Sequence, residues 1–353
     1  MSDVLGNSLK LMVFGESHSP LIGASISGLP SGIKIDESFI SYQLEKRKAN
    51  DNLSSGRQED DNFKIVSGVF NGYTTGTPLT ILIENSKYNS SDYQEKTFRP
   101  GHADYTGELK YSGYQDYRGG GHFSGRLTAP IVAICSIIIS YLEDKGIKIG
   151  SRIYEIHGVQ DEEIIDLPSS INKFNSEIFP TVSDKQKELM KKEILKAKEN
   201  QDSVGGVIES FIIGLEGGIG NPFFDSLESN IAHSLFSIPG VKGIEFGLGF
   251  SFKDKYGSEV SDSLRNVNNK ILTSSNNNGG INGGISNGMP IQIKTVIKPT
   301  PSIGKEQLTI DSKTKENTTI SIKGRHDPCI VRRARVVIDS LLAFTILDTM
   351  LSR

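Results

Sequence analysis

Five short segments of this chain combine histidine or arginine with glycine, serine, proline or aspartate, although the chain contains only six histidines. Glycine allows a backbone to approach a ligand closely, arginine binds phosphate and carboxylate groups through paired hydrogen bonds, and histidine exchanges protons near neutral pH. This combination predicts an enzyme site for a molecule that carries several negative charges. The segments are residues 15–18, 99–105, 118–126, 231–240 and 324–329.

The segments resemble those of the chorismate synthases, in which they occur in the same order. The resemblance runs from residue 1 to about residue 351 and includes the stretches 64–70 and 283–288. A single four-residue match would be weak evidence, but five matches in order are specific. The resemblance implies one α/β (α+β) domain over residues 1–353, in which a sandwich of antiparallel sheets encloses helices. It also implies a cytoplasmic homotetramer.

The family reaction is the anti-1,4-elimination of phosphate from 5-enolpyruvylshikimate 3-phosphate, which gives chorismate in the last step of the shikimate pathway. The phosphate and the two carboxylates of this substrate carry about three to four negative charges, so several fixed cations must bind it. An isolated arginine is more often a solvated surface residue, but position within glycine-rich segments favours a ligand role. The resemblance assigns substrate binding to Arg47, Arg118, Arg126 and Arg325.

Three side chains are implied to move protons. By resemblance, His18 protonates the departing phosphate and His102 manages the N1 proton of reduced FMN. A pKa near neutrality suits both tasks. Asp327 would assist proton transfer near the flavin N5 atom, which takes the C6 hydrogen of the substrate; alternatively, it holds Arg325 in place.

The resemblance implies reduced FMN as cofactor, although the reaction has no net redox change. The flavin acts as a transient electron donor, while the protein supplies orientation and electrostatics. The chain has no glycine motif typical of Rossmann or nucleotide-hydrolysing proteins. The residues implied to bind FMN are His122, Phe123, Ser124, Pro239, Gly240, Gly283, Lys298, Pro299, Thr300, Pro301, Ser302 and Arg325.

Several positions depart from the family pattern. Ser19 replaces a usual glycine, Gly125 replaces a common alanine, and His122 stands where many members have arginine. A histidine beside the flavin phosphate would make FMN binding depend on pH, unless its ring faces away from the phosphate. Asn52 or Leu53 falls where an arginine is associated with NADPH, so NADPH binding is uncertain and we expect an external reductant for the flavin.

Composition restricts the other functions. A net charge of −3 gives no global basic field, so we expect no nucleic-acid partner. Cys135 and Cys329 lie far apart without metal-ligand spacing, which fits a reducing compartment and no metal site. The most apolar run, residues 127–142, is shorter than a membrane span and predicts a buried helix. We therefore expect no membrane association.

The elements that must position these residues are predicted from apolar patterns and turn residues. Strands are expected at residues 9–14, 23–26, 63–70, 79–83 and 291–297. Helices are expected after a capping box formed by Ser183 and Gln186, with an apolar stripe through Leu189, Met190, Ile194 and Ala197, and at residues 330–351. Residues 46–61 are expected to form a loop over the ligand, and the glycine-rich stretch 273–288 to lead into a strand as a cofactor edge.

Two other functions fit parts of the sequence. A flavin oxidoreductase would use the same cofactor for net electron transfer, but it would need a hydride-donor site. An FMN-binding or phosphate-binding protein without catalysis would not need His18, His102 and Asp327 together. Both alternatives are weaker than the elimination reaction.

Overall fold

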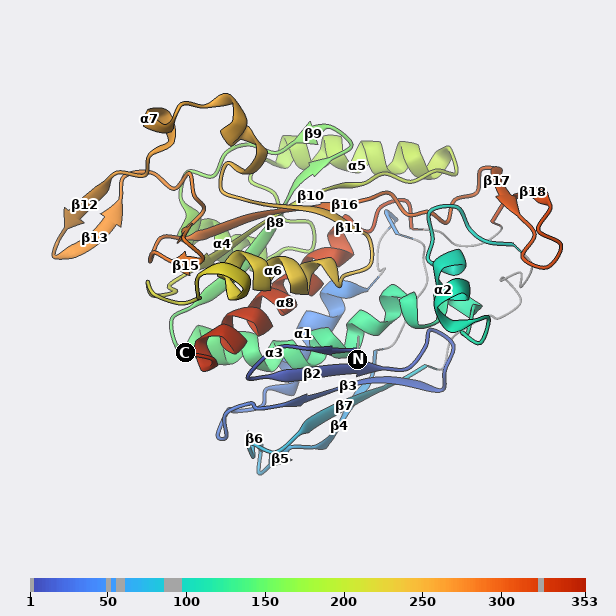
Figure 1. The fold of residues 1–353 in the computed structure, drawn as a ribbon, viewed down its shortest axis with the longest axis horizontal. Helices are drawn as coiled ribbons and strands as arrows, with labels where there is room; N and C mark the ends of the chain where they lie inside the picture. The colour runs from blue at the N-terminus through green and yellow to red at the C-terminus, as the bar shows by residue number, and fades with distance from the viewer. Residues whose placement is uncertain (1–2, 49–51, 55–60, 86–96, 323–326) are drawn as a thin grey trace.

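The structure is a computed structural model that describes residues 3–48, 52–54, 61–85, 97–322 and 327–353. Within these residues, two five-stranded antiparallel sheets lie on either side of a layer of helices (Figure 1). The buried apolar side chains of both sheets and of the enclosed helices form one continuous cluster. The predicted sandwich of antiparallel sheets enclosing helices is confirmed.

The first sheet carries the loop that contains His18. Its strand order is β1-β2-β3-β7-β4, and every neighbouring pair is antiparallel. In β7, buried residues alternate with more exposed ones, as expected of a sheet with one face on the core. The strands are β1 Val4–Leu5, β2 Lys10–Phe14, β3 Leu21–Ser27, β4 Phe63–Ser67 and β7 Leu79–Glu84.

The second sheet has the order β11-β16-β10-β8-β9, again antiparallel throughout. Strand β16, which lies between β11 and β10, coincides with the predicted strand at residues 291–297. The glycine-rich stretch precedes β16, and residues 298–302 follow it, so these two predicted cofactor segments lie at opposite ends of one strand. The strands are β8 Lys148–Ile156, β9 Val159–Gln160, β10 Gly206–Ile213, β11 Val241–Phe246 and β16 Ile291–Ile297.

Three helices fill the layer between the sheets: α1 Glu37–Arg47, α3 Thr128–Asp144 and α8 Val331–Leu351 (Figure 1). Both α3 and α8 are apolar on most faces because they are covered by sheets and by each other. The stretch Gly125–Asp144 is long and apolar enough to cross a membrane, but most of it is buried inside the protein. Both predicted core helices are confirmed.

The remaining elements surround these layers (Figure 1). Further helices are α2 Asp104–Tyr111, α4 Leu167–Ser176, α5 Asp184–Glu199, α6 Leu227–Phe236 and α7 Gly257–Val260. Short 3₁₀ turns occur at Arg118–Phe123, Gly125–Leu127, Phe223–Asp225 and Gly249–Asp254. Small hairpins are formed by β5 Val69–Phe70 with β6 Tyr73–Thr74, β12 Leu264–Val267 with β13 Lys270–Thr273, β14 Ile281–Asn282 with β15 Ile285–Ser286, and β17 Gln307–Ile310 with β18 Asn317–Ile320.

Three expectations about elements were wrong in part. The strand predicted at residues 63–70 is divided at Gly68, whose φ of +82° ends β4 and starts a hairpin. The loop predicted at residues 46–61 begins too early, because Lys46 and Arg47 form the last turn of α1. In α5, Ser183 caps the helix as predicted, but Leu189 is partly exposed and lies outside the buried stripe.

The N-terminal end of the first sheet is tied to α8 through Asp348. Its carboxylate accepts hydrogen bonds from the backbone N–H groups of Asn7, at 2.8 Å, and Leu9, at 2.7 Å. These residues lead directly into β2, the strand that ends at the His18 loop. The last helix of the chain therefore holds the start of that strand.

We expect Asp348→Ala to lower the free energy of unfolding by about 1–3 kcal/mol, because buried backbone donors lose their acceptor. Asp348→Asn keeps one acceptor oxygen and should cost less. Urea unfolding measures both, with Asp254→Ala as a control, because that carboxylate is exposed and pairs only with neighbouring Lys253 in the bonds described. Equal stabilities for Asp348→Ala and Asp254→Ala would contradict the anchoring role.

Candidate active site

The loop between β2 and β3 presents His18 as a buried side chain. Gly15 opens the loop with a φ of +103°, a conformation that glycine adopts without strain. Ser19, which departs from the family glycine, closes it: its hydroxyl accepts from Glu16 N at 3.0 Å and lies 2.6 Å from Leu21 O. The substitution therefore supplies hydrogen bonds that hold the loop.

A glycine turn at the start of the predicted segment 118–126 separates the two predicted catalytic histidines. A Cβ atom at Gly119 would lie 2.5 Å from Ser17 Oγ and 2.8 Å from His18 Nε2, closer than real contacts allow. A Cβ atom at Gly120 would lie 3.3 Å from His102 Cε1. Both glycines also have positive φ. Glycine is thus required here because the backbone passes between the two imidazole rings.

His102 is oriented by an ionic group of its own. Its Nδ1 lies 2.6 Å from Asp104 Oδ1, so the carboxylate accepts the Nδ1 proton. Arg99 binds the same carboxylate through Nε, at 2.8 Å, and Nη2, at 2.7 Å. Burial alone would raise the pKa of Asp104, but hydrogen bonds from Arg99 and His102 outweigh it and bring the pKa below its ordinary value. A charged carboxylate therefore fixes the ring, whose Nε2 edge faces Gly120.

The segment 298–302 reaches the same region from the end of β16. Lys298 donates from Nζ to Gly101 O at 2.6 Å, directly beside His102, and its backbone N–H donates to Gly240 O at 2.9 Å. Burial, followed by the charge of Lys242, lowers the pKa of Lys298 below its ordinary value. The predicted segments around His102, Gly240 and Lys298 are therefore brought together.

Ser302 and Thr300 connect this segment to two further groups. Arg99 Nη1 donates to Ser302 Oγ at 3.3 Å, and Thr300 Oγ1 donates to the backbone oxygen of Asp327 at 2.8 Å. The carboxylate of Asp327 pairs with Arg333, on the first turn of α8. Arg325, the partner considered for Asp327 in the sequence, lies outside the described residues.

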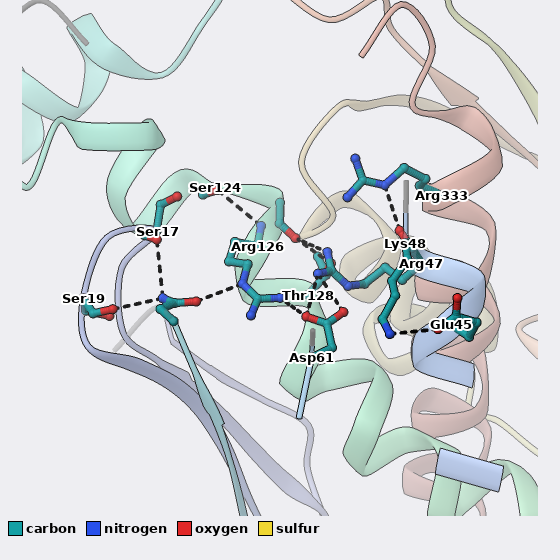
Figure 2. Close-up of polar contacts among 12 residues, drawn as sticks. Ser17, Ser19, Glu45, Arg47, Lys48, Asp61, Ser124, Arg126, Thr128 and Arg333 are labelled. Carbon is teal, nitrogen blue, oxygen red and sulfur yellow. Dashed lines mark hydrogen bonds and ion pairs between the residues drawn. The ribbon is translucent and has the colours of Figure 1, made fainter. Parts of the chain in front are cut away.

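Arg47 and Arg126 share one buried carboxylate, that of Asp61 (Figure 2). Arg47 Nη2 lies 3.3 Å from Asp61 Oδ2, and Arg126 Nη1 pairs with Asp61 Oδ1. The side chains of Arg47, Arg126 and Asp61 are only 4%, 5% and 1% exposed. Two guanidinium groups are thus buried side by side at this carboxylate, and their positive charge favours binding of an anion.

Arg118 has a different environment. Its guanidinium binds Asp116 through two hydrogen bonds of 2.8 Å, and its side chain is 41% exposed. The hydrogen bond from Arg118 lowers the pKa of Asp116 below its ordinary value, and the charge of nearby His18 acts in the same direction. Arg118 therefore lies near His18, but it is far more exposed than Arg47 and Arg126.

The predicted flavin contacts at residues 122–124 have other partners. His122 donates from Nδ1 to Gly15 O at 2.8 Å, and its Nε2 lies 3.2 Å from Asp3 Oδ1. The ring of Phe123 packs against Gly107 and Tyr111 on α2. Ser124 Oγ caps the next turn by accepting from the Arg126 N–H at 3.2 Å. These bonds tie the His122 ring to the start of the His18 loop, and its contact with the flavin phosphate stays a prediction.

Gly283 is the predicted cofactor residue that the fold keeps apart from the others. It lies in the turn of the β14–β15 hairpin, before the start of β16, whereas Lys298 follows the end of that strand. The seven residues of β16 span about 20 Å. In Figure 1, β15 and α2 lie at opposite sides of the molecule. Within one chain, Gly283 is thus not part of the group around His102.

The sequence analysis missed the residues that hold the predicted ones in place. Arg99 and Asp104 lie in the segment 99–105, which the sequence analysis identified. Their charges next to His102 in the sequence could have indicated that they orient its ring. Asp61 and Asn85 stood outside every glycine motif and gave no signal of their own. Among the described residues, no cluster of three histidine, cysteine, aspartate or glutamate side chains could hold a metal ion.

We expect Asp61→Asn to lower the free energy of unfolding by about 3–5 kcal/mol, because it removes the buried carboxylate charge that pairs with both Arg47 and Arg126. Inorganic phosphate should restore part of the lost stability by binding Arg47 and Arg126 in place of the removed carboxylate charge. Asp116→Asn is the matched control, since its partner Arg118 is exposed and such pairs contribute about 0–1 kcal/mol. Urea unfolding with and without phosphate measures the stability of both variants. Equal losses of unfolding free energy in Asp61→Asn and Asp116→Asn, with no recovery in phosphate, would contradict the electrostatic interpretation.

Comparisons with known proteins agree with this geometry. The family model described as chorismate synthase matches residues 9–351. The chorismate synthase of Korarchaeum cryptofilum is 43% identical to this chain over 98% of the chain and 96% of that protein, and that of Pyrococcus abyssi is 43% identical over 99% and 97%. A solved structure described as a crystal structure of chorismate synthase has a TM-score of 0.78 and 28% identity, covering 98% of this chain and 93% of that one. On these matches, and on the arrangement of His18, His102 and the arginines, the chain belongs to the chorismate synthase family.

Proposed function

We propose that this lyase family member eliminates phosphate from 5-enolpyruvylshikimate 3-phosphate to form chorismate, with His18 and His102 as proton-transfer groups. The observation that carries the proposal is the glycine turn at Gly119 and Gly120, which abuts both histidines. The buried Arg47 and Arg126 supply the positive charge that a polyanionic substrate needs. Family membership supports the reaction, and this geometry supports the roles.

The substrate's anionic groups would bind at the cationic group formed by Arg47, Asp61 and Arg126. Burial strengthens such electrostatic interactions because little water competes for the guanidinium groups. Arg118, and Arg325 outside the described residues, would complete the set of cations. The substrate would thereby be fixed with its leaving phosphate near His18.

The reaction breaks the C3–O bond to phosphate and the C6–H bond, and a new double bond completes the diene of chorismate. His18, as an imidazolium, would give its proton to the leaving phosphate, which lowers the charge on the departing oxygen. Asp327 would take part in moving the C6 hydrogen. Its carboxylate is held in place by the ion pair with Arg333.

The residues around His102 fit a flavin with a phosphate tail. The amine of Lys298 and the hydroxyls of Thr300 and Ser302 converge there with Pro239 and Gly240, and such groups suit a phosphate and the polar edge of a flavin. A bound anion would also oppose the lowering of the Lys298 pKa. When bound in its reduced form, FMN would supply an electron transiently to the allylic system. His102 would hold the proton near N1.

The flavin would be reduced from outside. Leu53, one of the two residues at the place associated with NADPH, is buried, and the backbone oxygen of Asn52 accepts from Lys198 at 2.6 Å. Neither residue supplies a cation for a nucleotide phosphate. We therefore propose an external reductant rather than reduction by NADPH on this chain.

We also propose a cytoplasmic homotetramer. Large apolar side chains are exposed on the β12–β13 hairpin, at Leu264 and Ile271, and this hairpin extends away from the body of the molecule (Figure 1). Exposed apolar groups of this kind are typical of association surfaces. The mass in solution, measured by sedimentation equilibrium, tests this assembly.

We expect His18→Ala and His102→Ala each to lower kcat by about 10²- to 10⁴-fold, because each removes a positioned proton-transfer group. Anaerobic release of phosphate and chorismate with chemically reduced FMN measures the rates. His157→Ala is the matched control, because that histidine is 60% exposed and pairs with Glu193 at the surface. Rates near that control in both variants would contradict the assignments.

FMN should bind more tightly when substrate is present, because both occupy one closed site. Lys298→Ala should weaken FMN binding by about tenfold, because it removes one charge-assisted hydrogen bond that contributes about 1.5 kcal/mol. Lys305→Ala is the control, because Lys305 is half-exposed and pairs with Asp202. Titration of FMN fluorescence measures the affinity. Equal affinities in the two variants would reject the placement, and NADPH oxidation without phosphate release would favour a flavin oxidoreductase.

A further inference from the structure

We propose that Asn85 is a positioning residue for this reaction, because it joins the anion-binding Arg126 to the loop that carries His18. The proposal rests on the proposed function for its kinetic consequences. Asn85 immediately follows β7, and its backbone N–H donates to Pro20 O at 3.0 Å, at the end of the His18 loop. Its place is therefore fixed by the first sheet.

One half of the Asn85 carboxamide holds the His18 loop. Its Nδ2 atom lies within hydrogen-bond distance of three backbone oxygens on either side of His18: Ser19 O at 3.1 Å, Glu16 O at 3.3 Å and Ser17 O at 3.4 Å. The amide NH₂ group supplies two N–H donors to these oxygens. Glu16 O also accepts from the N–H and the hydroxyl of Ser19, so the amide adds to the hydrogen bonds that hold this loop.

The other half of the carboxamide holds the guanidinium. Asn85 Oδ1 accepts from Arg126 Nε at 2.9 Å, and Arg126 continues to Asp61 through Nη1. Figure 2 shows Arg126 between Asp61 on one side and Ser17 and Ser19 on the other. A side chain at this position must donate on one side and accept on the other. A carboxamide does both, whereas an ionised carboxylate only accepts.

The consequence for catalysis follows from this geometry. The proposed proton donor and the cation that binds the substrate belong to different segments, and the Asn85 carboxamide spans the gap between them. A misplacement of about 1 Å in such an arrangement costs about 10²-fold in rate. Asn85 thus acts through His18 and Arg126 and needs no contact with the substrate itself.

Two variants separate the two halves of the carboxamide. Asn85→Ala removes both contacts, and we expect kcat to fall by about 10- to 100-fold and KM to rise by about 3- to 10-fold. Asn85→Asp keeps the acceptor for Arg126 but removes the donor to the loop. We therefore expect its KM to stay within about threefold of wild type while kcat stays as low as in Asn85→Ala.

Thr80→Val is the matched control. Thr80 lies on the same strand and bonds through its hydroxyl to Ser25 on β3, at 2.9 Å, without contact to the His18 loop in the bonds described. It should leave both kinetic constants unchanged. Amide hydrogen exchange gives a readout that needs no activity. The N–H groups of Ser17 and Ser19, which bond to Gly121 O and Glu16 O, should exchange faster in both Asn85 variants than in the control.

Several results would overturn the proposal: a kcat for Asn85→Ala within threefold of wild type, an Asn85→Asp variant that regains kcat, or one whose KM is as high as that of Asn85→Ala. Unchanged exchange at Ser17 and Ser19 would do so as well. Failure of the wild-type protein to release phosphate from the substrate would instead reject the proposed function. The exchange comparison would then still decide whether Asn85 holds the loop.

Discussion

The site depends on the burial of two guanidinium groups against a single carboxylate. Burying Arg47 and Arg126 removes them from water at a large desolvation cost, and the carboxylate of Asp61, which pairs with both, offsets part of that cost. The group is tolerable because all three side chains are held by hydrogen bonds from different segments. Such an arrangement is poorly suited to stability alone, and it becomes favourable when an anion enters. The buried positive charge that destabilises the folded protein is thus the charge that would bind the substrate.

The enclosed helices and the two sheets make this burial possible. Arg47 is the last residue of α1, Arg126 precedes α3, and Arg333 begins α8, so the polar ends of three core helices meet at one place. Their apolar bodies fill the space between the sheets. The first sheet brings His18 to this place, and the second brings Lys298 through the end of β16. The groups proposed to act in catalysis and binding, which come from distant parts of the sequence, therefore lie together at the polar ends of these helices.

The sequence predicted the parts of this structure that local pattern controls. The core helices follow from long, mainly apolar stretches, and β16 follows from alternating apolar residues after a glycine-rich stretch. The pairing of Asp61 with two arginines could not be predicted, because it joins residues up to 65 positions apart. The position of Gly283 before β16 was predicted, but its separation from the residues around His102 was not, since sequence motifs carry no distances. The hydrogen bonds of Ser19 show that a departure from the family pattern can support the same loop.

The most direct test of the central claim is a balance of products in one anaerobic reaction. The wild-type protein is supplied with 5-enolpyruvylshikimate 3-phosphate and chemically reduced FMN, and phosphate, chorismate and oxidised flavin are measured together. An elimination held in place by Arg47, Arg126 and His18 predicts equal amounts of phosphate and chorismate over many turnovers, with no oxidised flavin accumulating. Flavin oxidised in proportion to turnover, or phosphate released without chorismate, would contradict it.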